Sequence, residues 1–234
     1  MKKIILLIVV YIVMQSCNSQ TTKNEKEGKK PLISKPPMEA KKNNSREILF
    51  TDLKFKTSID EMLGKIGLTL NDNALNEYNI SGDYEEFKFT PRQINLFDNN
   101  IDSEKNETSF FYTKKDKLVW CYEINILDND DALKIIKSFE NKYGGKPAFL
   151  KISLSTKEHP LFLDENGEFK KDKMEQRILV WEDLKEKVTF FLIYNVNYDT
   201  KPVEGSLQII AIDKDNKKYK DWVSYRSLDI YYKN

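Results

Sequence analysis

The sequence predicts an α+β fold, mainly an antiparallel sheet with two helices packed on one face. Segments rich in Val, Ile, Phe, Tyr and Trp outnumber the two segments with helical periodicity, and short polar turns join several of them. Strands joined by hairpins are typical of an antiparallel sheet covered by helices. The expected strands are Glu85–Phe89, Ser109–Thr113, Lys117–Leu127, Phe149–Leu154, Ile178–Asp183, Val188–Asn195 and Leu207–Ile212.

The first helix is expected over residues 59–66. Ser58 and Glu61 have the spacing of a capping box, in which the Ser hydroxyl accepts from a backbone N–H three residues later. Gly67 follows the last apolar position and ends the helix. Its expected apolar face consists of Ile59, Met62, Leu63 and Ile66.

The second helix is expected to begin at Asp128. Asp130 and Asp131 lie in its first turn, where acidic side chains complement the helix dipole. Gly144-Gly145 ends it, with Pro147 beyond. Its expected buried stripe consists of Leu133, Ile136, Phe139 and Tyr143.

Two segments carry hairpin signals. Asp183–Lys187 separates two expected strands, and Glu165–Glu168 contains Asn166-Gly167. A helix followed by Trp-containing strands occurs twice, which suggests two similar helix-plus-sheet halves. Such units are similar to those of β-lactamase-inhibitor-like proteins and of the small lipoprotein of the β-barrel assembly machinery. The resemblance is a fold analogy and implies no function.

The N-terminus has the pattern of an export signal. Lys2 and Lys3 precede eleven apolar residues, Ile4 to Met14. A helix of that length measures roughly 16 Å at 1.5 Å per residue. A bilayer core of about 30 Å needs about 20 residues. The segment is therefore too short to span stably, and a signal peptide over residues 1–16 is expected.

Cys17 closes this segment and resembles the lipobox cysteine of bacterial lipoproteins. Met14 and Ser16 suit the −3 and −1 positions, whereas Gln15 departs from the small residue usual at −2. The resemblance implies a diacylglyceryl group on Cys17 and a cell-envelope protein with a membrane anchor. Asn18 follows, in place of the Asp that often marks inner-membrane retention, and this favours the outer membrane. The domain would face the periplasm or the exterior; the sequence does not distinguish these.

Residues 17–47 are expected to form a disordered tether. They contain three prolines and few apolar residues, so they cannot bury enough surface to fold. Residues 48–234 are long enough for a single α+β domain with its own core. Residues 18–47 carry a net charge of +4 and residues 48–234 a net charge of −5. A mildly acidic domain excludes the electrostatic footprint of a nucleic-acid-binding protein.

Motifs for catalysis or cofactor binding are missing from the sequence. The single histidine, His159, and one free cysteine cannot supply the usual zinc ligands, and the expectation is a surface-loop histidine. Glu182-Asp183 beside Trp181 could serve a glycosidase, but a solvated strand end is the favoured interpretation. Asp213–Lys217 begins like a calcium loop yet has Lys at the fifth position, which favours a polar turn. No catalytic residue, metal site or cofactor is predicted.

Cys121 lies in an apolar run and is expected to be a buried, inert thiol. Most aromatic residues are expected in the core. Three tyrosines near the C-terminus form either a partner-binding surface or an edge strand that covers the core. They are Tyr225, Tyr231 and Tyr232.

These features favour a non-enzymatic envelope lipoprotein whose domain binds a protein partner, in an assembly or an immunity role. A carboxylate-based hydrolase acting on cell-wall or glycan material is a second hypothesis. A module that binds a small ligand is a third.

Overall fold

The computed structural model describes residues 47–75, 82–97, 99–102, 105–163 and 165–229, with backbone alone at 159–162. All of them belong to one unit, Lys41–Asn234. Cys17, and the tether expected over residues 17–47 except Glu47, lie outside the described residues. None of the described helices is long and apolar enough to cross a bilayer.

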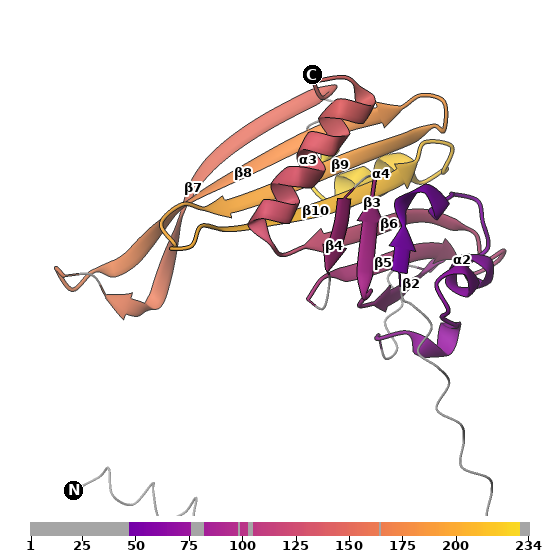
Figure 1. The fold of residues 1–234 in the computed structure, drawn as a ribbon, viewed down its shortest axis with the longest axis horizontal. Helices are drawn as coiled ribbons and strands as arrows, with labels where there is room; N and C mark the ends of the chain where they lie inside the picture. The colour runs from indigo at the N-terminus through magenta and orange to yellow at the C-terminus, as the bar shows by residue number, and fades with distance from the viewer. Residues whose placement is uncertain (1–46, 76–81, 98, 103–104, 164, 230–234) are drawn as a thin grey trace, which may run out of the picture. The chain divides into compact units, whose positions relative to one another are not determined.

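A seven-stranded antiparallel sheet forms the centre of the fold, which confirms the predicted class (Figure 1). Each predicted strand is present, and the two strands of the Asn166-Gly167 hairpin are far longer than expected. The turn at Asp183–Lys187 joins two neighbouring strands as predicted. In spatial order the strands are β2 (Tyr84–Phe89), β5 (Glu107–Thr113), β6 (Val119–Ile126), β10 (Glu204–Asp213), β9 (Val188–Asn197), β8 (Phe169–Asp183) and β7 (Phe149–Leu163).

This order contains two antiparallel runs, β2-β5-β6 and β7-β8-β9-β10, that meet where β6 pairs with β10. A second, three-stranded sheet was not predicted, because strands of three or four residues are too short to show a periodic pattern. It consists of β1 (Glu47–Leu49), β3 (Gln93–Leu96) and β4 (Asn99–Asp102), with β1 parallel to β3.

Both predicted helices are present and begin at the predicted caps. In α2 (Ile59–Lys65), the Ser58 hydroxyl accepts from the Glu61 N–H at 3.2 Å. In α3 (Asn129–Tyr143), the Asp128 carboxylate accepts from the N–H of Asp131 at 2.9 Å. Two short 3-10 helices, η1 (Phe50–Asp52) and η2 (Leu70–Asp72), and the described α-helix α4 (Tyr219–Tyr225) were not predicted.

The buried stripe of α3 differs from the predicted one. Leu133 is 43 % exposed, so its predicted burial is wrong, whereas Ala132 and Ile135 are fully buried. Phe139 is buried as predicted. Ala132, Ile135 and Phe139 have the i, i+3, i+7 spacing of one helix face, and Leu133 lies to the side of that face.

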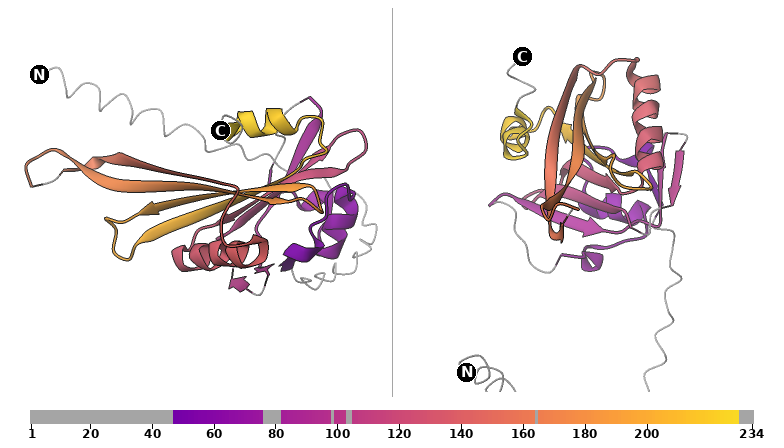
Figure 2. Two further views of the ribbon diagram at one scale, coloured as in Figure 1. Left: turned by 90° about the horizontal axis from the view of Figure 1, so that it is seen from above. Right: turned by 90° about the vertical axis from the view of Figure 1, so that its left-hand side faces the viewer.

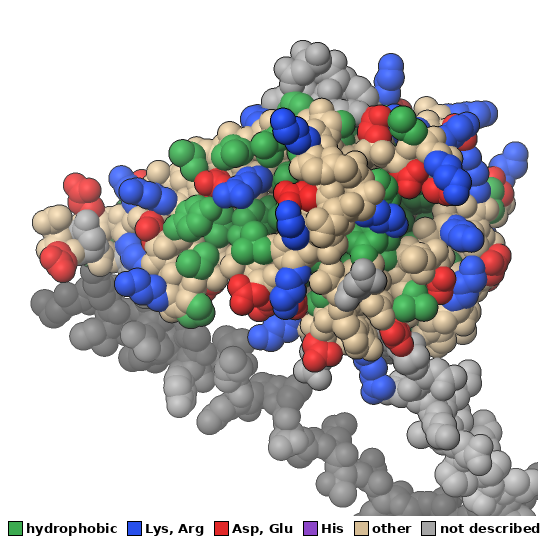
Figure 3. All heavy atoms as spheres, turned by 45° about the horizontal axis from the view of Figure 1, so that its top comes forward, with side chains coloured by type: hydrophobic (Ala, Val, Ile, Leu, Met, Phe, Trp, Pro, Cys, Tyr) green, Lys and Arg blue, Asp and Glu red, His purple; other side chains and the backbone are tan. Residues whose placement is uncertain are grey.

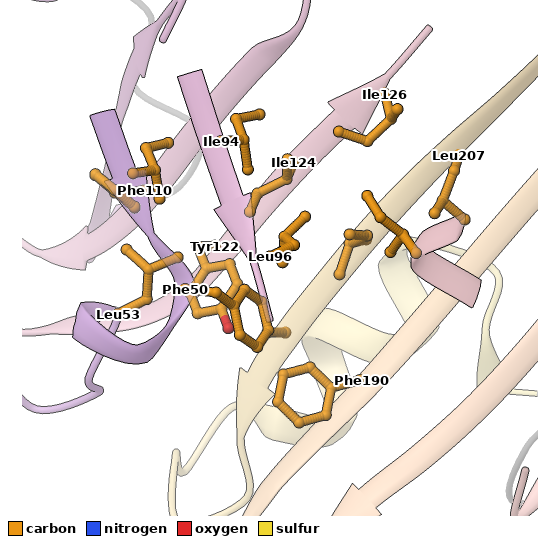
Figure 4. Close-up of a cluster of buried hydrophobic side chains, with 14 of the residues drawn as sticks. Phe50, Leu53, Ile94, Leu96, Phe110, Tyr122, Ile124, Ile126, Phe190 and Leu207 are labelled. Atoms are coloured by element: carbon orange, nitrogen blue, oxygen red, sulfur yellow. The ribbon is translucent and has the colours of Figure 1, made fainter. Parts of the chain in front are cut away.

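The helices lie on both faces of the large sheet (Figure 2). The buried residues of α2 and α3 belong to one hydrophobic core, together with Tyr122 and Ile124 of β6. Figure 4 shows part of this core. The buried residues of α4 belong to a second core that includes Cys121, on the opposite face. The predicted arrangement of two helices packed on one face is therefore not confirmed, because a further described helix, α4, covers the opposite face.

Candidate functional site

The predicted C-terminal tyrosine surface is only partly described. Tyr231 and Tyr232 lie outside the described residues. Tyr225 is the last residue of α4 and is 80 % exposed, so the alternative of an edge strand at this position is wrong. A single exposed tyrosine on a short helix does not by itself make a binding surface.

Cys121 is a free, fully buried thiol, as predicted. Burial raises its pKa strongly; Glu123 and Glu86 add to this increase, and the Arg226 guanidinium opposes it. A thiol with a raised pKa is rarely ionised at neutral pH, and the thiolate is the nucleophilic form.

Glu182 and Asp183 do not form a facing pair of acids. Successive residues of a strand point to opposite faces of the sheet. The Glu182 carboxylate binds Lys214 Nζ at 2.8 Å, and the Asp183 carboxylate accepts from the N–H of Glu186 at 2.9 Å in the β8–β9 turn. Trp181 beside them is 2 % exposed and belongs to the core. These groups stabilise the end of a hairpin, in agreement with the favoured strand-end interpretation.

The segment Asp213–Lys217 is an ion-paired polar turn, as predicted. Asp213 accepts from the Asp215 N–H at 2.7 Å. Lys56 Nζ lies 3.4 Å from Asp213 and 2.7 Å from Asp215, and Lys187 Nζ lies 3.2 Å from Asp215. These cations lower the pKa of Asp215, and their hydrogen bonds to its carboxylate are the main cause.

No group of three or more His, Cys, Asp or Glu residues that could hold a metal occurs within the described part of the chain. The backbone of His159 lies in strand β7, so its predicted position in a loop is wrong.

Strand β7 presents an apolar ladder to solvent. It is the last strand in the order, so its outer edge pairs with none of the described strands. Leu150, Ile152 and Leu154 are 51 %, 54 % and 80 % exposed and share one face by their alternation. Leu150 lies opposite Leu179 of β8, which places the ladder on the face of α3. Figure 3 shows hydrophobic side chains gathered on one part of the surface, with charged side chains around them.

The opposite face of the same strand carries lysines. Lys151 and Lys157 are exposed, and neither forms an ion pair with another described residue. Apolar and polar residues alternate along this segment, and that alternation predicted the strand. It contained no signal that the apolar face would stay uncovered, since that depends on where α3 ends on the sheet.

A pocket of about 470 Å³ lies where the C-terminal end of α3, the η1 segment and the β8–β9 turn meet. Leu53 and Val188 contribute aliphatic walls, and lysine and carboxylate side chains form the rim. Aromatic rings provide the remaining walls: Phe50, Phe55, Tyr122, Tyr143 and Phe190.

Comparison with protein-family models gave no match, and neither did comparison with curated proteins or with solved structures.

Proposed function

We propose that this chain is a lipid-anchored protein of the bacterial cell envelope whose folded domain is a non-catalytic protein-binding module. The leader that ends at Cys17 supports the anchor, and Asn18 supports the outer membrane. The outer edge of β7, which pairs with no strand among the described residues, supports the binding role, and it is the observation that carries the proposal.

The β7 edge is well suited to strand addition. An unpaired edge offers a row of backbone N–H and C=O groups, and proteins usually shorten, charge or cover such edges. This edge belongs to a strand of 15 residues. From Phe149 to Thr156 its only charged residue is Lys151. An extended segment of a partner would continue the sheet there through main-chain hydrogen bonds.

The side chains of β7 define the chemistry of that segment. Apolar residues on one face of the incoming strand would pack on Leu150, Ile152 and Leu154. Acidic residues on its other face would lie near Lys151 and Lys157, neither of which forms an ion pair with a described residue. The partner is therefore expected to present an extended segment in which apolar and acidic residues alternate.

The hydrolase hypothesis has less support. The pKa values of Asp83, Asp116 and Asp215 are lowered, in each case mainly by a side-chain hydrogen bond, so these three groups do not suit the role of a glycosidase acid. A glycosidase acid needs a raised pKa instead.

The proposal is tested by photocrosslinking in cells. A benzophenone amino acid replaces Ser153 in the full chain, and the matched control places it at Leu184, a 77 % exposed residue of the β8–β9 turn. Position 153 is expected to crosslink to a single partner, and position 184 is expected to crosslink to none. The Ile152→Lys substitution should abolish the product formed at position 153. Absence of any product at 153 overturns the proposal, and so does a product made of two copies of this chain.

A further inference from the structure

We infer that the domain has a second site, for an uncharged planar aromatic molecule that carries a hydrogen-bonding group. The site is the pocket of Phe50, Phe55, Tyr122, Tyr143 and Phe190. This inference goes beyond strand addition, because no residue that lines the pocket lies in β7.

The aromatic side chains that form the pocket walls pack against one another. Phe55 stacks on Tyr122 with ring centroids 5.3 Å apart and planes 10° apart. Phe50 meets the same tyrosine edge-on at 6.0 Å, and Tyr143 packs on Phe190 at 5.5 Å. Rings fixed in this way present a preformed apolar surface, and a flat aromatic ligand gains from both stacked and edge-to-face contacts with it.

The Tyr122 hydroxyl supplies the polar contact. Tyr122 is 2 % exposed and lines the pocket, yet its hydroxyl makes no hydrogen bond to any residue that the structure describes. In Figure 4 its ring lies beside Phe50, and the oxygen points away from Ile124. Burial raises its pKa well above the usual value, so the group remains an O–H donor. The hydroxyl is not one of the fully buried polar atoms that lack a partner, so it is reachable from the pocket and a ligand acceptor can bind it there.

The rim favours a ligand without net charge. Lys142 Nζ lies 5.4 Å from the centroid of the Tyr143 ring, and Lys54 also lines the pocket. Asp183 and Glu186 lie close enough to Tyr143 for their charges to raise its pKa, although burial is the larger cause. The lining contains three lysines and three carboxylates, so its formal charges balance and do not favour a ligand of either sign. The volume of about 470 Å³ lies within the range of small-molecule sites, roughly 300–1,000 Å³.

The test compares two probes that differ by one hydroxyl, 4-fluorophenol and fluorobenzene. Each is titrated into the full chain in detergent, and the methyl NMR signals of Leu53 and Val188 in the pocket are followed. Both probes are expected to shift these signals saturably, with 4-fluorophenol binding more tightly. Tyr122→Phe should weaken 4-fluorophenol about tenfold, the effect of one lost hydrogen bond. The same variant should leave fluorobenzene within about twofold.

Tyr194→Phe is the matched control, since it removes a hydroxyl that binds Asn129 outside the pocket at 2.7 Å. It should change neither affinity, and Ile152→Lys in β7 should also leave both unchanged. If Tyr122→Phe does not fold, Leu53→Trp fills the pocket instead and should abolish both titrations. Absence of saturable shifts, or equal weakening of the two probes by Tyr122→Phe, overturns the inference without affecting strand addition.

Discussion

Arg226 and Glu123 form a largely buried ion pair that joins the end of α4 to the centre of the large sheet. Arg226 Nε lies 2.6 Å from Glu123 Oε1, and the two side chains are 13 % and 14 % exposed. The guanidinium also lies 4.8 Å from the ring of Trp222 and 5.2 Å from that of Phe111. The contact spans 103 residues of sequence and fixes the helix that covers the second core.

Arg226→Met should lower the free energy of unfolding by about 3 kcal/mol, because it leaves the Glu123 carboxylate buried without its partner. Adding Glu123→Leu should restore most of that loss, since the charge is then removed. Urea unfolding of the three proteins measures both effects. Glu61→Gln, which breaks the exposed pair with Lys65, is the control and should cost less than about 1 kcal/mol. An Arg226→Met protein as stable as the control would show that the buried pair does not stabilise the fold.

Gly205 is expected to tolerate no side chain. A Cβ at this position would lie 2.9 Å from Asn129 Cγ and closer still to Oδ1, which accepts from the Tyr194 hydroxyl. Gly205→Ala should therefore destabilise the protein by about 1–3 kcal/mol, the usual cost of overpacking.

Gly64→Ala serves as the matched control, because nothing lies within 4 Å of a Cβ there. It lies inside α2, so it should stabilise the protein by about 0.5–1 kcal/mol. Thermal unfolding measures the two changes. Equal effects of the two substitutions would contradict the close contact between Gly205 and Asn129.

Stability should fall at alkaline pH. Burial is the main cause of a raised pKa in the folded state for one thiol and five phenols. Their contribution is fully present below the pKa of the unfolded chain and is lost as pH rises toward the folded-state values, because only the unfolded chain then releases protons readily. The groups are Cys121, Tyr84, Tyr112, Tyr122, Tyr143 and Tyr194.

The decline should begin near pH 9 to 10, the ordinary pKa values of the thiol and the phenols. Tyr122→Phe should make the curve of unfolding free energy against pH shallower by up to about 1.4 kcal/mol per pH unit. Chemical unfolding at pH 7 to 11 provides the measurement. A stability that stays constant to pH 11 would contradict the assigned shifts.

Cys121 should react with a maleimide only when the fold opens. The experiment uses a Cys17→Ser background, so that Cys121 is the sole thiol. Labelling should be slow in buffer and should accelerate with urea in step with unfolding, because the thiol is buried and its pKa is raised. Leu184→Cys in the same background supplies an exposed thiol and should label at once. Rapid native labelling of Cys121 would point to a reactive role.

The lipid anchor is tested separately from the domain. Labelled palmitate should enter the wild-type chain and should be absent from Cys17→Ser, since the resemblance places the acyl-bearing thioether on this sulfur. Mass spectrometry of the mature N-terminus should show a modified cysteine. An unmodified Cys17, or an intact leader in membranes, would remove the anchor from the proposed function.

Local signals predicted the parts of the fold that depend on near neighbours. The caps at Ser58 and Asp128 satisfy N–H groups only three residues away, so sequence spacing was enough to place both helix starts. The long strands were found for a similar reason, because alternation along one segment is a local property. Strands β1, β3 and β4 are too short to show such a pattern and were not predicted.

Proximity between distant segments could not be predicted. The aromatic pocket joins Phe50, Tyr122 and Phe190 from three separate parts of the chain, and no spacing in the sequence connects them. The helix α4 was missed because its seven residues carry only one turn of apolar spacing, at Tyr219, Trp222 and Val223, which is too short to separate a helix from other structures.

By itself the sequence determined the positions of two helices and seven strands, because hydrogen-bonding caps and side-chain alternation act within a few residues. The same locality underlies the N-terminal leader and its cysteine, which remain a prediction. Only the tertiary structure decided that α3 leaves Leu150, Ile152 and Leu154 uncovered and that Tyr122, whose hydroxyl has no described partner, lines the aromatic pocket. Exposure and hydrogen-bond satisfaction depend on what the rest of the chain places against a residue, and that is fixed only when the layers pack.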